Sequence, residues 1–185
     1  MASAPIRVAI ITLSRRVAKG LRADAGGDAV ARCVTEAGMQ VVERRVIADD
    51  AVLLDWELRR LSDAPDVDVI LTTGGTGLSE DDIAPETTLA VLEKRLTGME
   101  WAMFQAGLKK TPHAMLSRGV AGARNKTLII NLPGNPKGAV ENLEAVIMTI
   151  PHAVQVLKNK QVKDEDHAVS GSGTRNTPEG GKKQD

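Results

Sequence analysis

The sequence predicts an α/β fold, a three-layer sandwich in which a mostly parallel sheet carries helices on both faces. Short apolar segments rich in β-branched residues alternate along the chain with segments whose apolar residues recur at helical spacing. That alternation is typical of parallel strands joined by right-handed crossovers. With 185 residues the chain has the length of one domain, enough for a full hydrophobic core.

Four segments have the composition of strands. Residues 6–14 and 67–73 are short and nearly all apolar, so we expect these two strands to be buried on both faces. Residues 39–48 form a more amphipathic strand, and residues 126–134 form the fourth. Because ligands bind beyond the carboxyl ends of parallel strands, the loops that follow these segments are the candidates for function.

The first two helices are expected on either side of the second strand. Residues 15–27 have a polar, glycine-containing composition that predicts a loop. Asp28 is the predicted N-cap of a helix that reaches Ala37 and stops at Gly38. Leucines recur at helical spacing over residues 50–62, which predicts the second helix.

Three further helices are expected in the second half of the chain. Pro85 suits the first position of a helix that continues to Leu96, and a weaker helix spans residues 100–110. A last apolar stripe runs over residues 140–157. Pro151 lies inside it and should kink or restart the helix, because an interior proline costs about 3 kcal/mol.

One domain, residues 6–157, holds everything informative, between a loose end over residues 1–5 and a tail over residues 158–185. The tail has only three apolar residues, too few to offset the entropy of ordering it, so we predict that it is disordered.

Composition excludes several classes of function. Lys plus Arg is 24 and Asp plus Glu is 24, so no basic surface for nucleic acid is expected, and 2% aromatic residues leave few rings for base stacking. No apolar run approaches the roughly 20 residues that span a bilayer, so we expect no membrane partner. The lone Cys33 and the lack of a signal-peptide pattern predict a cytoplasmic protein.

A glycine-rich loop, TTGGTG, ends the third predicted strand. Glycines let backbone N–H groups approach an anion closely, and the following helix adds its positive N-terminal dipole. The pattern is neither a P-loop nor a dinucleotide fingerprint, and composition alone favours phosphate binding and a plain strand-to-helix turn equally. The candidate phosphate-binding residues are Gly74, Gly75, Thr76 and Gly77.

A second loop of this kind ends the fourth predicted strand, and a helix follows at once. Lys137 is placed to lie over an anion at that helix start, although this segment alone favours a turn with a solvated lysine. Two such loops at the ends of two parallel strands predict two walls of one phosphate-rich cleft. The residues concerned are Pro133, Gly134, Asn135, Pro136 and Lys137.

Acidic residues lie close to the first loop in the sequence. Asp82 and its neighbour Asp81 follow GGTG, and Asp49 and Asp50 end the second strand. Carboxylates beside phosphates are unfavourable unless a cation lies between them, and Mg²⁺ binds one or two carboxylates together with phosphate oxygens. The alternative is that these acids are solvated or cap helices, and Asp50 is well placed to be a cap.

Ser117 and Arg118 lie in a glycine-containing connection before the fourth strand, where a hydroxyl and a guanidinium can hold a phosphate or a heterocycle. An ordinary loop explains the composition equally well. The three histidines, His113, His152 and His167, lack metal-ligand spacing and are expected at the surface or in packing.

Two stretches together resemble the molybdopterin adenylyltransferase family, the MogA/MoaB-like fold that also occurs as the G domain of gephyrin. They are TTGGTGLSEDDIAPETT, residues 72–88, and SRGVAGARNKTLIINLPGNPKGAVENL, residues 117–143. The likeness covers about residues 6–157. It implies adenylylation of molybdopterin by ATP with Mg²⁺, which gives adenylyl-molybdopterin and pyrophosphate. It also implies a homotrimer, with a molybdenum insertase as a downstream partner.

The resemblance assigns roles residue by residue. Asp82 and Asp49 match the acids that the family uses for catalysis and Mg²⁺. The family's nucleotide loop corresponds to Gly74, Gly75, Thr76 and Gly77. The molybdopterin-binding positions correspond to Ser117, Arg118, Pro133, Gly134, Asn135, Pro136 and Lys137.

The chain departs from the family pattern at two positions. The first strand of the family usually ends in Ser-Asp, whereas here Ser14 is followed by Arg15; the residue before the catalytic aspartate is often Arg, whereas here it is Asp81. These changes leave the MogA-like and MoaB-like branches open. They also motivate one alternative, a molybdopterin-binding or scaffold protein without turnover. A second alternative is a hydrolase of nucleotide pyrophosphate bonds, as in relatives of competence-damage proteins.

Overall fold

The computed structural model describes residues 4–158 and contains a six-stranded sheet. The strand order is β2-β1-β3-β6-β5-β4. The four parallel strands are β1 (Arg7–Leu13), β2 (Gln40–Ile47), β3 (Val69–Thr73) and β6 (Thr127–Leu132). At one edge β5 (Ala121–Arg124) pairs antiparallel with β6, and β4 (Lys94–Arg95) pairs antiparallel with β5. The predicted tail beyond residue 158 lies outside the described residues.

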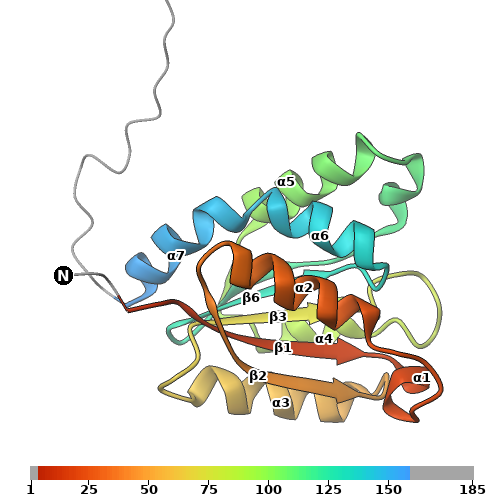
Figure 1. The fold of residues 1–185 in the computed structure, drawn as a ribbon, viewed down its shortest axis with the longest axis horizontal. Helices are drawn as coiled ribbons and strands as arrows, with labels where there is room; N and C mark the ends of the chain where they lie inside the picture. Colours follow the sequence, from red (N-terminus) through yellow and green to blue (C-terminus); the bar gives the residue numbers. More distant parts are fainter. Residues whose placement is uncertain (1–3, 159–185) are drawn as a thin grey trace, which may run out of the picture.

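Helices cover both faces of the sheet, so the predicted three-layer α/β sandwich is confirmed (Figure 1). One face carries α2 (Ala25–Glu36), α5 (Thr97–Leu108), α6 (Pro136–Glu144) and α7 (Ile150–Leu157). The other carries α3 (Ala51–Asp63) and α4 (Ala84–Val91). Within the part of the chain that the structure describes, no helix combines the length and apolarity that a bilayer crossing requires.

Alternate side chains of the inner strands supply the two cores. On β1, Val8 and Ile10 face the helices of the first layer, whereas Ala9 and Ile11 face α3 and α4. All four side chains are fully buried or nearly so. A strand with both faces covered needs apolar residues at every position, which explains the continuous apolar runs in the sequence.

The helix predicted to start at Asp28 begins one turn earlier. Asp24 is the N-cap of α2, and its carboxylate accepts the N–H of Gly27 at 2.9 Å. Asp28 lies in the first turn, where its carboxylate pairs with Arg44 on β2 at 2.7 Å. The predicted loop before this helix also contains one short helix, α1 (Arg15–Ala18), capped by Ser14. The Asp28 cap prediction was therefore wrong, because a first-turn acid and a cap acid have the same local signature.

The predicted helix from Pro85 to Leu96 is too long. It ends at Val91, and the chain then forms β4 before α5 begins at Thr97. β5, like β4, was missed, because strands of four and two residues depend on pairing with a neighbour rather than on their own composition. The expected break at Pro151 is confirmed, since this proline is the second residue of a new helix, α7.

A buried carboxylate joins three segments at the amino end of the sheet. The Asp68 side chain, 3% exposed, lies just before β3 and accepts the guanidinium of Arg7 at 2.9 Å and the ammonium of Lys158 at 2.5 Å. Burial alone raises the pKa of Asp68, but the hydrogen bonds from Arg7 and Lys158 outweigh it and lower the pKa to about 2. Lys158, assigned by sequence to the tail, is thus tied to the body.

We predict that Asp68→Asn lowers the free energy of unfolding at pH 7 by about 2 kcal/mol, measured by urea denaturation. Because the folded-state pKa is depressed from 3.8 to about 2, this contribution is complete above pH 4 and is lost as the pH falls toward 2. The difference in free energy of unfolding between parent and variant should shrink toward zero over that range. The exposed Asp66→Asn is the matched control. A gap that stays constant down to pH 2 would contradict this assignment.

Candidate functional site

The two glycine-rich loops touch at the carboxyl edge of the sheet. β3 and β6 pair in parallel register, with Thr73 opposite Leu132. Both strands therefore end side by side, and the loops that follow them start next to each other. The hydroxyl of Thr73 donates to the carbonyl of Pro133 at 2.7 Å, and the N–H of Gly74 donates to the carbonyl of Leu132 at 3.1 Å. These bonds fix the first loop against the second.

The backbone conformation requires glycine at two positions in this contact. Gly74 has a φ of +101° and Gly75 a φ of +63°, values that side chains rarely adopt. A Cβ at Gly74 would lie 2.3 Å from the carbonyl oxygen of Leu13, at the end of β1. A Cβ at Gly134 would lie 3.2 Å from the Cα of Gly74, so the two loops meet backbone to backbone.

A groove of about 440 Å³ lies between these loops and the end of β1. We call it the glycine groove; its lining includes Gly74, Gly75, Gly134, Asn135 and, from the first turn of α2, Gly26. The amino ends of α2 and α6 both reach it, and each contributes the positive end of its helix dipole. That arrangement suits an anion such as a phosphate chain.

Asp24 also lines the glycine groove and was not identified from the sequence. Its carboxylate caps α2 and accepts the hydroxyl of Thr12 at 3.0 Å and the guanidinium of Arg44 at 3.1 Å. The signal was present, because aspartate is among the preferred N-cap residues.

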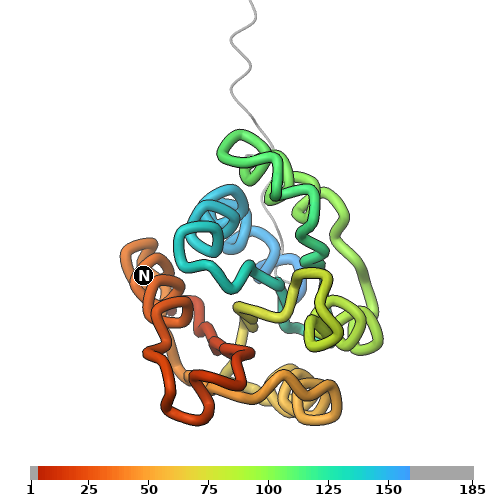
Figure 2. The backbone as a smooth tube through the Cα atoms, turned by 90° about the vertical axis from the view of Figure 1, so that its right-hand side faces the viewer, coloured from red at the N-terminus to blue at the C-terminus, as the bar shows by residue number. Residues whose placement is uncertain are grey.

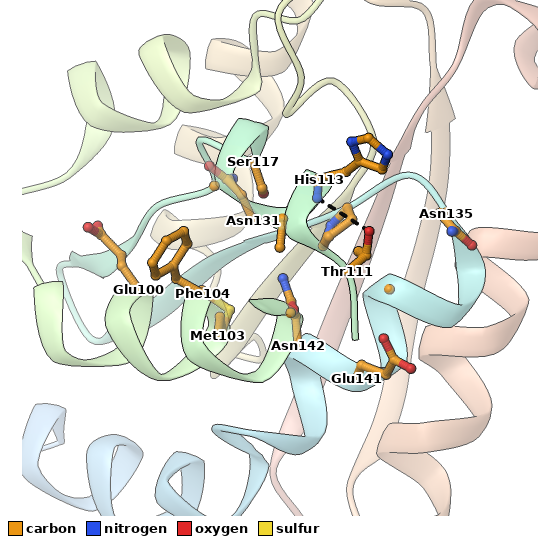
Figure 3. A pocket seen from close by; sticks show the side chains of 15 residues that line it. Glu100, Met103, Phe104, Thr111, His113, Ser117, Asn131, Asn135, Glu141 and Asn142 are labelled. Atoms are coloured by element: carbon orange, nitrogen blue, oxygen red, sulfur yellow. Dashed lines mark hydrogen bonds between the residues drawn. The ribbon is translucent and has the colours of Figure 1, made fainter. Parts of the chain in front are cut away.

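A second, more apolar hollow of about 200 Å³ lies on the other side of the loop that follows β6. We call it the apolar cleft. Figure 3 shows Met103 and Phe104 of α5 with Ser117, Asn131 and Asn142 around it. Of its lining, sequence analysis identified Ser117, Pro133 and Asn135 and missed the side chains from α5 and α6. Those come from helix faces, where core and cleft residues share one periodicity.

Polar groups lie at the edge of the apolar cleft. The Glu100 carboxylate accepts the Arg95 guanidinium at 2.9 Å and the N–H of Ala121 at 3.1 Å. Glu141, on α6, lines the cleft from another side (Figure 3). Apolar walls with a few fixed polar groups are typical of sites for flat organic ligands.

One loop separates the two hollows. Asn135 lines both the glycine groove and the apolar cleft, while Pro133 lines the cleft and Gly134 the groove. Asn135 also caps α6, and its side-chain oxygen accepts the N–H of Lys137 at 3.1 Å. A ligand with an anionic part and a flat apolar part can therefore occupy both hollows across this wall.

Arg118 holds the loop of residues 76–82 rather than lining the cleft. Its Nε donates to the carbonyl of Gly77 at 2.7 Å, and its Nη2 donates to the carbonyl of Asp82 at 2.8 Å. The same guanidinium pairs with Glu86. The N–H of Arg118 donates to the carbonyl of Thr76 at 3.1 Å. All three side-chain nitrogens are thereby engaged, and the guanidinium acts as a clamp on the loop.

The Asp82 carboxylate lies within this clamped loop. It accepts the N–H of Ser79 at 2.8 Å and the Ser79 hydroxyl at 2.6 Å. Burial by itself raises the pKa of Asp82, but the bonds from Ser79 and Gly77 and the charge of Arg118 outweigh it, so this pKa lies below its usual range. Asp82 is therefore ionised at neutral pH.

Asp49 lies on a neighbouring loop, where its carboxylate accepts the N–H of Arg15 at 2.9 Å. Asp50 is the N-cap of α3, as the alternative to a cation-binding role predicted. Neither Asp49 nor Asp82 lines the groove or the cleft. Over residues 4–158 no three His, Cys, Asp or Glu side chains gather into a metal cage. Two carboxylates nonetheless fit Mg²⁺, which takes its other ligands from phosphate and water.

Three predicted residues lie apart from the groove lining. Thr76 and Gly77 continue into the clamped loop, and their carbonyls bond Arg118. The Lys137 side chain, 81% exposed, extends from the first turn of α6 and lies 4.0 Å from Glu141. It is free to swing toward an anion.

Comparisons with known proteins identify the family to which this chain is similar. Residues 9–152 match the family described as a probable molybdopterin binding domain. The chain is 40% identical over 154 residues to a molybdopterin adenylyltransferase of Helicobacter pylori, covering 82% of this chain and 88% of that protein. It is 32% identical over 179 residues to that of Escherichia coli K12, covering 89% and 92%. The crystal structure of the molybdopterin biosynthesis enzyme MoaB from Thermus thermophilus is 41% identical, with a TM-score of 0.79, covering 85% and 99%.

We predict that Gly74→Ala lowers the free energy of unfolding by about 2–4 kcal/mol, because the new Cβ meets the Leu13 carbonyl and the positive φ is strained. Gly98→Ala is the matched control, since a Cβ there has no neighbour within 4 Å. Thermal or urea denaturation measures both. Equal stability of the two variants would contradict the contact between β1 and the first loop.

Proposed function

The chain belongs to the molybdopterin-binding family of molybdenum cofactor biosynthesis, and on that premise we propose that it transfers an adenylyl group from ATP to molybdopterin. The observation that carries the proposal is the shared wall at Asn135, with an anion-binding groove on one side and an apolar cleft on the other. Molybdopterin has a flat pterin and a terminal phosphate. The cleft suits the pterin, and the groove suits the phosphates.

The reaction joins two anions. An oxygen of the molybdopterin phosphate attacks the α-phosphorus of ATP; the new P–O bond forms as the bond from the α-phosphorus to the bridging oxygen breaks, and pyrophosphate leaves. No protein nucleophile is needed, so catalysis rests on positioning and on neutralising charge. The backbone N–H of Gly75, the helix starts at the groove, and Lys137 contribute to both.

Asp82 and Asp49 would hold Mg²⁺ in this scheme. Asp82 is kept ionised by the donors of Ser79, and Asp49 is held by the backbone of Arg15. The metal would supply positive charge against the triphosphate and the leaving pyrophosphate. Arg118 would support the loop that carries Asp82, rather than contact the pterin, since its guanidinium is engaged with that loop.

The direct test incubates the purified chain with ATP, Mg²⁺ and molybdopterin and measures pyrophosphate and adenylylated pterin. Release of pyrophosphate that needs both substrates is the expected result. Tight pterin binding without pyrophosphate would indicate a scaffold protein instead. ATP consumption that is independent of pterin would indicate a nucleotide pyrophosphate-bond hydrolase.

For Asp82→Asn we expect turnover to fall about a hundredfold or more, because the variant keeps the shape of the loop but loses the charge that holds the metal. The dissociation constant for molybdopterin should stay within about threefold of the parent, since Asp82 does not line the apolar cleft. Pyrophosphate release and pterin fluorescence titration measure the two quantities separately.

Glu80→Gln, an exposed acid of the same loop, is the control and should retain turnover. Near-normal turnover in Asp82→Asn would refute the metal role. An equal loss of pterin affinity would place Asp82 in the pterin site.

We also expect a homotrimer in solution. Large apolar side chains remain exposed beside the apolar cleft: Trp101 is 60% exposed, Met115 62% and Leu116 51%. Exposed apolar side chains gathered near a site favour an interface. Light scattering at micromolar protein should give three times the monomer mass, and Trp101→Glu should lower it. A monomer mass for the parent would contradict the prediction.

A further inference from the structure

An exposed ion pair joins two loops at the carboxyl edge of the sheet. The guanidinium of Arg15, in the first turn after β1, lies 2.5 Å from the carboxylate of Asp81 on the loop that follows the glycines. The two side chains are 51% and 56% exposed. The two residues are 66 positions apart in the sequence. They lie beyond the last paired residues of β1 and β3, so the ion pair joins the loops that follow these two strands.

The same residue, Arg15, contacts both acid-bearing loops. Its backbone N–H donates to the Asp49 carboxylate at 2.9 Å, and its side chain binds the residue that directly precedes Asp82. The turn that carries Arg15 is itself anchored, since the N–H of Ser14 donates to the carbonyl of Ile47 at 2.9 Å. Arg15 therefore forms a bridge from Asp49 to the Asp81–Asp82 segment.

The two partners of this pair are the two positions at which the chain departs from the family pattern. A base stands at position 15 and an acid at position 81, and the structure places them in contact. The acid at position 81 is neutralised by its partner rather than left to repel phosphates.

The geometry points to the Arg15–Asp81 pair as a clasp that positions Asp49 and Asp82 relative to each other, with both residues acting as positioning residues. This inference rests on the proposed function, because it concerns the acids assigned there to the metal. Arg118 holds the same loop at the carbonyls of Gly77 and Asp82, so the loop is fastened from two sides. Removal of the Arg15–Asp81 pair therefore leaves the loop still attached through Arg118.

The experiment is a charge-swap cycle with the variants R15A, D81A, R15A/D81A and R15D/D81R. The first readout is the Mg²⁺ concentration that half-saturates pyrophosphate release, alongside the KM for molybdopterin. The second needs no turnover: Mn²⁺ replaces Mg²⁺, and its binding in the presence of ATP is followed by electron paramagnetic resonance. R16A and E80A, the exposed neighbours of the pair, are the matched controls.

Each single variant should raise the half-saturating Mg²⁺ concentration and weaken Mn²⁺ binding about two- to fivefold, the range expected for an exposed pair. The KM for molybdopterin and the melting temperature should stay at parental values. R15A/D81A should be no worse than either single variant, and R15D/D81R should recover toward the parent. Both controls should match the parent.

Three results would overturn the clasp: single variants equal to the parent, losses that multiply in R15A/D81A, or a swap no better than the single variants. Failure of the proposed function is distinguishable from these. A parent protein that releases no pyrophosphate would contradict the adenylyltransferase assignment. The Mn²⁺-binding measurement would still decide whether Arg15 and Asp81 act together on the two acids.

Discussion

The parallel pairing of β3 with β6 is the constraint on which the candidate site depends. Its register places Gly74 beside Gly134 and lets Thr73 bond the loop after β6. The approach is close because neither glycine has a Cβ and because Gly74 also packs on the Leu13 carbonyl at the end of β1. The groove, the wall at Asn135 and the cleft beyond it all follow from this contact. Figure 2 views the backbone from the side toward which the strand arrows of Figure 1 point.

The two acids assigned to the metal lie outside both hollows, whereas Asp24 lines the groove and pairs with Arg44. Asp82 and Asp49 are each held by N–H donors on loops outside the groove, and two arginines fasten the loop of Asp82 from different sides. Arg118 does so through backbone carbonyls, and Arg15 through Asp81. Both acids are thus held in place outside the groove, an arrangement that suits a metal-assisted transfer between two phosphates.

Local sequence signals predicted the parts of the fold that local physics determines. The four parallel strands, the break at Pro151 and the two glycine loops follow from apolar patterning and from turn chemistry. The strands of two and four residues, β4 and β5, exist only through their pairing. Asp28 was predicted as the cap and Asp24 was missed, because both precede the same apolar stripe. The α5 wall of the cleft was missed because Met103 has the spacing of a core residue and also reaches the core.

The central claim is that one ligand spans the wall at Asn135. A crystal structure of the protein with adenylyl-molybdopterin tests it most directly. The account predicts the pterin against Phe104 and Ser117 in the apolar cleft, with a phosphate oxygen within hydrogen-bond distance of the Gly75 N–H. A pterin lying in the glycine groove, or phosphates bound away from both glycine loops, would contradict it.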